Sequence, residues 1–268
     1  MLTEGVLKIK LSQLLSSLSF ALDIAENRYY NHSRRTAYIA YSIAKELGLS
    51  EDDIIDTYFA SLIHDIGMTG YLSGYSVMDI HNDMELVKKH CYFGYKVLEN
   101  LPLGNNIKDY ILYHHEEWNG TGPYGLKGDN IPLVSQIIHL ADYFELFFVR
   151  KVEEFEQFTN LDFINQWLNI CRGRTHNSRI CDALKSLIYK EKFWFDLMSK
   201  NIGRALDIIE PIKDIYIDID DLYNISESFS MLIDLKSKFT YDHSKEVSKI
   251  TCNFATYLGY NPLMVRKL

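Results

Sequence analysis

The sequence predicts an all-α protein whose helices form a bundle. Helical periodicity dominates the first 115 residues, and the period-two alternation of strands is scarce. The chain has 268 residues, of which 47% are hydrophobic and 24% charged, which is the composition of an ordinary globular protein and excludes a disordered or fibrous chain. This length leaves room for one large domain or two.

The first two predicted helices follow one another closely. Residues 31–47 carry apolar side chains at spacings of three and four, and Gly48 follows as a stop signal. Ser50 is expected to cap a second helix, with Asp53 completing a weak capping box. This helix ends in the sequence His64-Asp65-Ile66-Gly67. Its buried face comprises Ile54, Ile55, Tyr58, Phe59, Leu62 and Ile63.

The rest of the chain is also predicted to be mainly helical. Further helices are expected at residues 83–100, 106–115, 133–149 and 161–169, and again across 178–206. Residues 119–132 hold four of the fourteen glycines and two of the five prolines, which predicts an ordered loop. Residues 210–221 are interpreted as part of a linker.

Charge and cysteine content narrow the function. A net charge of −8 argues against a broad basic surface for a nucleic-acid duplex or an anionic membrane, but it leaves room for a local positive pocket. We expect no bilayer span and no export signal. The four cysteines have no CxxC spacing, which favours reduced, buried thiols in a cytoplasmic protein.

An internal repeat links the first helix to the C-terminal part of the chain. At a constant spacing of 211 positions, residues 30–48 and 241–259 share seven identities in nineteen positions, among them His32 with His243 and Gly48 with Gly259. The second copy stops before the place where a second His-Asp pair would lie. We therefore expect this chain to be a piece of a longer tandem protein.

Seven histidines and aspartates stand at positions typical of a metal site. Each alone is more often a core or surface residue, but adjacent imidazoles at His114 and His115, beside Glu116, are costly to bury unless a metal or hydrogen bonds engage them. Imidazole and carboxylate together suit first-row transition metals. The candidate ligands are His32, His64, Asp65, His90, His114, His115 and Asp142.

Charge counting indicates what this site would do. Two divalent cations with two carboxylates and neutral histidines would leave the pocket with about +2, which suits phosphate oxygens and a bridging hydroxide. That is the requirement of a phosphodiesterase. Asp65 is the candidate bridge between the two cations and the candidate catalytic residue.

The order of these residues resembles the HD-GYP branch of the HD-domain metal-dependent phosphohydrolase superfamily. Residues 119–133 are similar to the glycine-rich GYP loop of that family, and the likeness covers about residues 20–150. It implies an all-helical HD-domain bundle that hydrolyses cyclic di-GMP or cyclic GMP-AMP with two divalent metals, iron or manganese before zinc or nickel. The seven candidate residues match the metal-ligand positions of the family.

Several positions depart from the family pattern. Met68 replaces a lysine, Arg28 replaces an acidic ligand of three-metal members, and Glu117 replaces an arginine. In the loop, Asn119 replaces an aspartate and Pro123 stands where the family has tyrosine. The ligands are thus kept while positions that face the substrate are altered, which predicts an intact metal site with changed or weakened catalysis.

Other residues near the site have weaker functional interpretations. Trp118, Asn119, Gly122 and Lys127 of the loop are candidates for substrate binding, Trp118 by stacking on a base. Packing and solvent exposure are competing interpretations for this tryptophan and lysine. His139 is expected in core packing or outside the first ligand sphere. His81 and His176 lie in polar segments and are expected at the surface.

These observations predict an HD-GYP-like domain at residues 1–197, with its metal site within 28–145, a linker at 198–224, and the start of a second HD-like repeat at 225–268. The predicted activity is hydrolysis of a cyclic dinucleotide by a metal-bridging hydroxide. One alternative is a degenerate domain that binds metal or nucleotide and regulates or dimerises with a second HD-GYP domain. Another is a phosphohydrolase for a different nucleotide or phosphomonoester.

Overall fold

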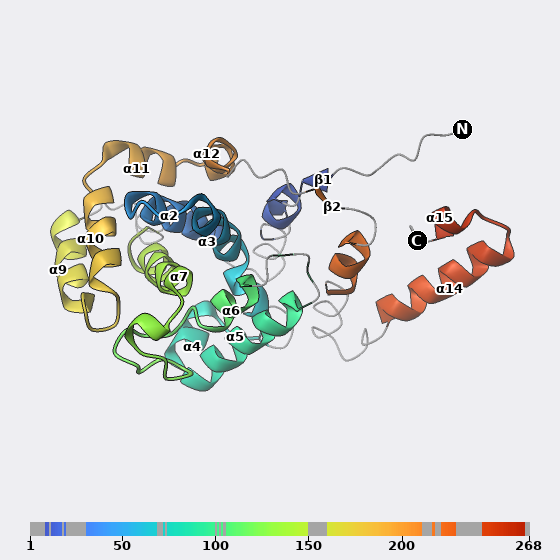
Figure 1. Ribbon diagram of the computed structural model, residues 1–268, viewed down its shortest axis with the longest axis horizontal. Helices are drawn as coiled ribbons and strands as arrows, with labels where there is room; N and C mark the ends of the chain where they lie inside the picture. Colours follow the sequence, from blue (N-terminus) through green and yellow to red (C-terminus); the bar gives the residue numbers. More distant parts are fainter. Residues whose placement is uncertain are drawn as a thin grey trace.

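The computed structural model describes residues 9–10, 12–17, 19, 31–68, 72, 74–99, 101, 103, 106–149, 160–210, 216–217, 221–228 and 243–265 (Figure 1). These residues form a helical bundle, which confirms the predicted all-α fold. One short antiparallel pair accompanies the helices, between β1 (Ile9–Lys10) and β2 (Tyr216–Ile217). Among the described residues, no helix has both the length and the apolar character needed to cross a membrane.

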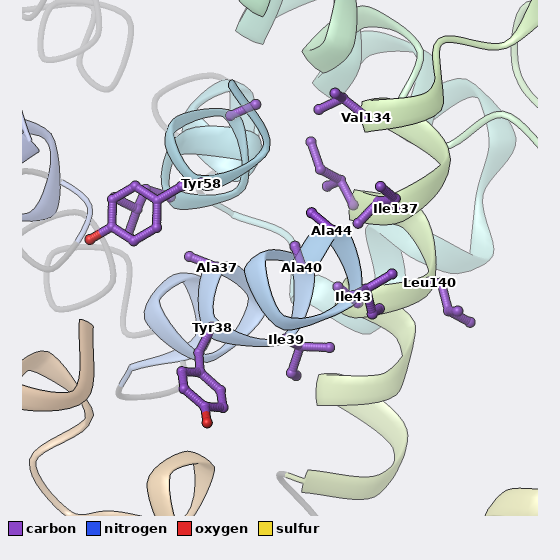
Figure 2. Packing of buried hydrophobic residues seen from close by; sticks show 14 of the residues in the cluster. Ala37, Tyr38, Ile39, Ala40, Ile43, Ala44, Tyr58, Val134, Ile137 and Leu140 are labelled. Carbon is purple, nitrogen blue, oxygen red and sulfur yellow. The ribbon is translucent and has the colours of Figure 1, made fainter. Parts of the chain in front are cut away.

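Three helices make the centre of the bundle. They are α2 (His32–Glu46), α3 (Glu51–Ile63) and α7 (Leu133–Phe144). Figure 2 shows Ala40 and Ala44 of α2 and Ile137 of α7 in the interior between α2, α3 and α7, and small side chains allow helix backbones to approach closely. This tight packing holds the starts and ends of the three helices in fixed relative positions.

Both ends of α2 and the start of α3 agree with the sequence prediction to within one residue, but α3 ends at Ile63, before the predicted end at residues 64–67. Gly48 has φ +67°, a conformation that favours glycine and ends α2. The Ser50 hydroxyl accepts a hydrogen bond from the Asp53 amide at 3.2 Å, as expected of an N-cap. A 3₁₀ turn (His64–Met68) follows α3 directly and carries the His-Asp pair.

The next helices are α4 (Val77–Asn82), α5 (Met84–Leu98) and α6 (Ile107–Leu112). Helix α4 was not among the predicted helices, and α6 ends at Leu112 instead of the predicted residue 115, because residues 113–115 form turns. Gly67 explains the close approach of α5, because a Cβ there would lie 2.1 Å from the His90 carbonyl oxygen. The His-Asp turn and α5 therefore touch backbone to backbone.

The remaining helices cover one side of this core. The helix predicted at 133–149 becomes π-helical at Glu145–Val149, and α9 (Leu161–Cys171) follows. The helical region predicted at 178–206 divides into α10 (Ser178–Leu187), α11 (Glu191–Leu197) and α12 (Ile202–Ile209). Residues 198–224, predicted as a linker, are therefore structured in part, because α12 buries Ile202 and Leu206.

The C-terminal helices repeat the pattern of the first two. Helix α14 (His243–Tyr257) has the length of α2 and begins 211 positions later, and α15 (Pro262–Val265) begins 211 positions after α3. Gly259, at φ +78°, stands in the place of Gly48. Figure 1 shows this pair at the end of the molecule opposite α9 and α10. Assignment to a second HD-like domain stays a prediction.

Candidate metal centre

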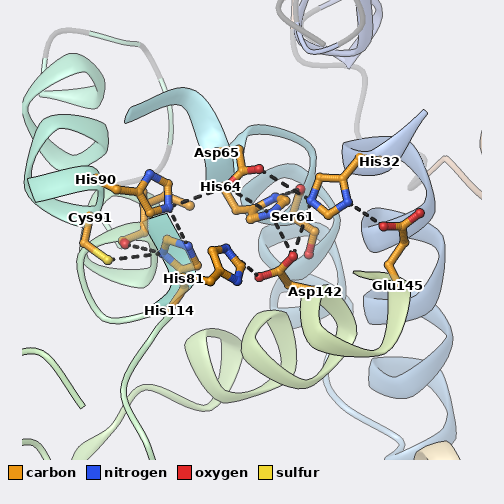
Figure 3. A network of polar contacts seen from close by, with 11 residues as sticks. His32, Ser61, His64, Asp65, His81, His90, Cys91, His114, Asp142 and Glu145 are labelled. Carbon is orange, nitrogen blue, oxygen red and sulfur yellow. Dashed lines mark hydrogen bonds and ion pairs between the residues drawn. The ribbon is translucent and has the colours of Figure 1, made fainter. Parts of the chain in front are cut away.

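The structure brings all seven predicted ligand residues to one place in the bundle. Figure 3 labels all of them except His115. They come from the start of α2, the 3₁₀ turn after α3, the middle of α5, the turn after α6, and α7. Each is at most 4% exposed. So many imidazoles and carboxylates would not be stable in a core without partners of their own.

One group of ligand atoms combines His32, His64 and Asp142, whose candidate atoms lie within 4.8 Å of one another. The Asp142 Oδ1 atom is 3.3 Å from His32 Nε2 and 3.7 Å from His64 Nε2. Neither of these two nitrogens makes a hydrogen bond, and both are buried. This arrangement brings two imidazole nitrogens and a carboxylate oxygen to a common point, as a cation site requires.

A second group combines His90, His114 and His115, again with candidate atoms within 4.8 Å of one another. The Nε2 atoms of His90 and His114 are only 3.1 Å apart. The His114 Nδ1 donates to the Ile111 carbonyl at 2.6 Å, so its Nε2 carries a lone pair. Two such nitrogens facing each other fit a shared cation.

Asp65 lies between the two groups. Its Oδ1 is 3.4 Å from His64 Nε2 and 3.5 Å from His90 Nε2, while its Oδ2 is 3.4 Å from His32 Nε2. A carboxylate that reaches histidines of both groups is placed to bridge two cations.

Outer hydrogen bonds fix the orientation of two of the histidines. The His32 Nδ1 lies 2.6 Å from Glu145 Oε2, and the His64 Nδ1 donates to the Ser61 carbonyl at 2.8 Å. Both contacts turn Nε2 toward the site, and such partners increase the basicity of a ligating imidazole. Arg35 Nη1 also lies 3.6 Å from Glu145 Oε1.

The pKa values of the histidines are shifted in opposite directions in the two ligand groups. Burial opposes protonation of His32, but the carboxylates of Glu145, Asp142 and Asp65 outweigh it and raise the pKa of His32 well above its usual value. Burial lowers the pKa of His114 to about 4, with His64 adding to the effect. Burial likewise lowers the pKa values of His90 and His115, so this group is neutral and ready to bind a cation.

Three residues of the site escaped sequence reasoning or were placed wrongly by it. Glu145 stands three residues after Asp142 on the same helix face, and that spacing was the available signal. His81 and His176, expected at the surface, are buried: the His81 side chain is 5% exposed and His176 is 6% exposed. His139 packs against His176, with their rings stacked 4.5 Å apart.

The glycine-rich loop is anchored beside the site by Glu116. Its carboxylate accepts hydrogen bonds from the amides of Tyr124 and Leu126 at 2.5 and 2.6 Å. A Cβ at Gly122 would lie 2.6 Å from the Glu116 Cα, so this glycine is needed for packing. Trp118 is half-buried, while Lys127 is exposed.

The residues that depart from the family pattern differ in their burial and in the groups that they contact. Met68 is 1% exposed and packs in a small apolar cluster with Leu72, Val77, Ile80 and Leu146. Asn119 Oδ1 accepts from the Thr121 amide at 3.0 Å, and Glu117 accepts from the Thr121 hydroxyl. Arg28 lies outside the described residues.

Comparison with known proteins supports the same family. Residues 29–146 match the HD domain. The chain is 26% identical to 3'3'-cGAMP-specific phosphodiesterase 1 of Vibrio cholerae over 268 residues, which cover 97% of this chain and 61% of that protein. It is 29% identical to a cyclic di-GMP phosphodiesterase of Thermotoga maritima over 147 residues, 53% of this chain and 40% of that protein.

A solved structure shares the fold. The crystal structure of a cyclic GMP-AMP specific phosphodiesterase of V. cholerae (V-cGAP3) superposes with a TM-score of 0.76 at 24% identity, covering 96% of this chain and 68% of that chain. The chain spans about three fifths of the length of the first of these curated relatives. Over residues 29–146 the chain therefore matches the HD-domain family, and the relatives to which it is similar are cyclic-dinucleotide phosphodiesterases.

Proposed function

We propose that this chain is a metal-dependent phosphodiesterase that hydrolyses a cyclic dinucleotide, 3'3'-cGAMP or cyclic di-GMP. The observation that carries the proposal is the position of Asp65, within 3.5 Å of histidines from both ligand groups. Relatives with these two activities match most of this chain or its HD domain. Two divalent transition-metal ions, iron or manganese, are the cofactors that we assign to the groups.

Each residue of the site has a defined task in this reaction. Bound cations supply positive charge for phosphate oxygens and lower the pKa of water near them. Asp65, whose carboxylate reaches histidines of both groups, would be a ligand of both cations. Glu145 orients His32 and keeps its Nε2 turned inward, and the Ser61 and Ile111 carbonyls do the same for His64 and His114.

The glycine-rich loop is the proposed binding surface for the nucleotide. Glu116 fixes this loop directly after the metal ligand His115, so Trp118 and Asn119 stand next to the site in sequence. Trp118 would stack on a base, and the exposed Lys127 would contact a phosphate from the same loop. Gly122 serves this surface through its packing on Glu116.

Met68 favours a second candidate function, a degenerate domain that binds metal and nucleotide but regulates a catalytic partner. Its side chain lies within the apolar cluster and offers no charge to a phosphate. The partner in this case is a second HD-GYP domain or a second copy of this chain. Pairing, a cytoplasmic location, and the domain bounds 1–197, 198–224 and 225–268 stay predictions.

The decisive test compares three proteins prepared without oxygen: wild type, Asp65→Ala and Asp207→Ala. Asp207 is an exposed aspartate of α12 and serves as the matched control. After loading with iron or manganese, metal per chain and hydrolysis of 3'3'-cGAMP and cyclic di-GMP are measured. We expect metal and turnover in wild type and in Asp207→Ala, and loss of both in Asp65→Ala.

The outcomes separate the two candidates. Wild-type protein that holds at least two ions per chain and binds nucleotide without turnover would support the regulatory function. Fewer than one ion per chain would contradict the ligand assignment itself. Thermal unfolding of the metal-free proteins shows whether Asp65→Ala remains folded, and Asp65→Asn provides an isosteric second variant.

A further inference from the structure

His81 is a buried histidine that neither the family resemblance nor the proposed reaction uses. It lies on α4, whose start is fixed by a reciprocal capping box between Ser76 and Asp79. Val77 and Ile80 of this helix pack into the apolar cluster that contains Met68. The helix therefore holds His81 in a defined position against the metal centre.

The His81 side chain contacts two of the candidate metal ligands, Asp142 and His115. Its Nε2 lies 3.8 Å from Asp142 Oδ2, and its ring centre is 4.8 Å from that of His115 (Figure 3 shows the contact with Asp142). The side chain is 5% exposed, and Nε2 makes no hydrogen bond. A buried imidazole nitrogen without a partner costs free energy, so something else must satisfy it.

We propose that His81 is a metal ligand and that His81, His115 and Asp142 hold a third cation. The candidate ligand atoms of these three residues lie within 4.8 Å of one another. The two oxygens of Asp142 face different groups: Oδ1 is 3.3 Å from His32 Nε2, and Oδ2 is 3.8 Å from His81 Nε2. Asp142 thus connects the third position to the first.

A third cation at His81, His115 and Asp142 changes which residues bind the second cation, the one assigned to the group of His90, His114 and His115. One imidazole nitrogen binds one cation, so His115 belongs to the third position when it is filled. The second position then keeps His90 and His114, whose Nε2 atoms are 3.1 Å apart, and Asp65, whose Oδ1 is 3.5 Å from His90 Nε2. The cation at His32, His64 and Asp142 would thus have Asp65 as a fourth protein donor, whereas the other two cations would each have three, and water or substrate would complete each shell.

A third cation changes what the site can bind. Position 68 offers an apolar side chain, which anchors the cluster beneath α4 and contributes no charge to a phosphate. An additional divalent ion beside His115 would place positive charge near the glycine-rich loop, because Glu116 ties that loop to the residue after His115. The inference rests on the proposed metal site and adds a ligand and a cation to it.

The test counts metal ions in four proteins: wild type, His81→Ala, His81→Asn and His176→Ala. His176 is a buried histidine outside every ligand group and provides the matched control. Each protein is stripped with a chelator, loaded anaerobically with Mn²⁺, freed of excess metal and analysed by plasma mass spectrometry. We expect three ions per chain in wild type and His176→Ala, and two in both His81 variants.

A second readout reports coordination directly. Loading with Co²⁺ gives visible absorption bands from the bound ion, and we expect both His81 variants to lose about a third of this intensity. Two ions in wild type, or equal counts in wild type and the His81 variants, would overturn the proposal while leaving the two-metal site intact. No metal in wild type would instead refute the proposed metal site. The wild-type count does not depend on the folding of any variant.

Discussion

Helices α2 and α14 have the same length and begin with the same His-Ser pair, yet their surroundings differ completely. His32 is 1% exposed and Ile39 is fully buried, whereas Ile250, the counterpart of Ile39, is 64% exposed. His243, the counterpart of His32, is exposed as well. A similar local sequence thus gives a similar helix with a different environment.

The comparison of α2 with α14 shows that helix formation depends on local sequence, whereas a metal site depends on residues from distant segments. Helix length and the glycine that ends it depend on nearby residues, so both copies have them. A metal site requires carboxylates from distant segments, and His32 meets Asp65, Asp142 and Glu145 only through the packing of α3 and α7. The histidine alone is not a site.

The largest contrast is expected from removing the first histidine of each helix. His32→Ala should reduce metal affinity by more than the roughly 10–100-fold that loss of an outer partner costs, since it deletes a direct ligand. His243→Ala should leave metal content unchanged. Metal titration of the two variants checks this. An equal loss in both would show that the exposed histidine also serves a site and would break the comparison.

Core substitutions test the packing difference without touching the metal. Ile39→Ala should lower the free energy of unfolding by about 2–5 kcal/mol, because it leaves a cavity between α2 and its neighbours. Ile250→Ala should change it by no more than about 0.5 kcal/mol. Denaturant unfolding of the metal-free proteins measures both. A large effect of Ile250→Ala would place α14 in contact with apolar surface.

The candidate ligands could be predicted from the sequence because their order along the chain is visible without any knowledge of the fold. The seven residues stand at helix ends or on buried helix faces whose periods are readable. The sequence also predicted α2 and the start of α3 closely, since Gly48 and Ser50 mark these boundaries by local chemistry.

The burial of His81 and Glu145 could not be predicted from the sequence, for a physical reason. Helix α4 has six residues, too few for an apolar period to stand out, so His81 read as a polar surface residue. Glu145 interrupts an apolar run, and no local pattern links it to His32, which lies far away in the sequence. Their burial depends on contacts across more than sixty residues of sequence, from His81 to Asp142 and from His32 to Glu145.

Glu145→Gln tests the carboxylate contact at Nδ1 that distinguishes His32 from its counterpart His243. The amide keeps the size of the side chain but lacks the charge that orients and polarises His32, so metal affinity should fall by roughly 10–100-fold. Isothermal titration with Mn²⁺ measures the change. Glu227→Gln, on the described helix at residues 221–228, is the control and should bind metal as wild type does. An unchanged affinity in Glu145→Gln would assign this carboxylate to structure alone.

The smallest contrast lies at the turn that follows each helix. Ser50→Ala removes the hydroxyl that accepts from the Asp53 amide, which should lower stability by about 1 kcal/mol. For a domain of this size the corresponding fall in Tm is about 2–4 °C. Asn261, the counterpart of Ser50, precedes the four-residue α15, and Asn261→Ala should leave the main transition where it is. Ser50→Asp restores a capping oxygen, so recovery of Tm in that variant would tie the loss to the cap. A shift in Asn261→Ala as large as that in Ser50→Ala would instead mean that α14 and α15 unfold together with the bundle, and the two copies would then differ in exposure but not in cooperativity.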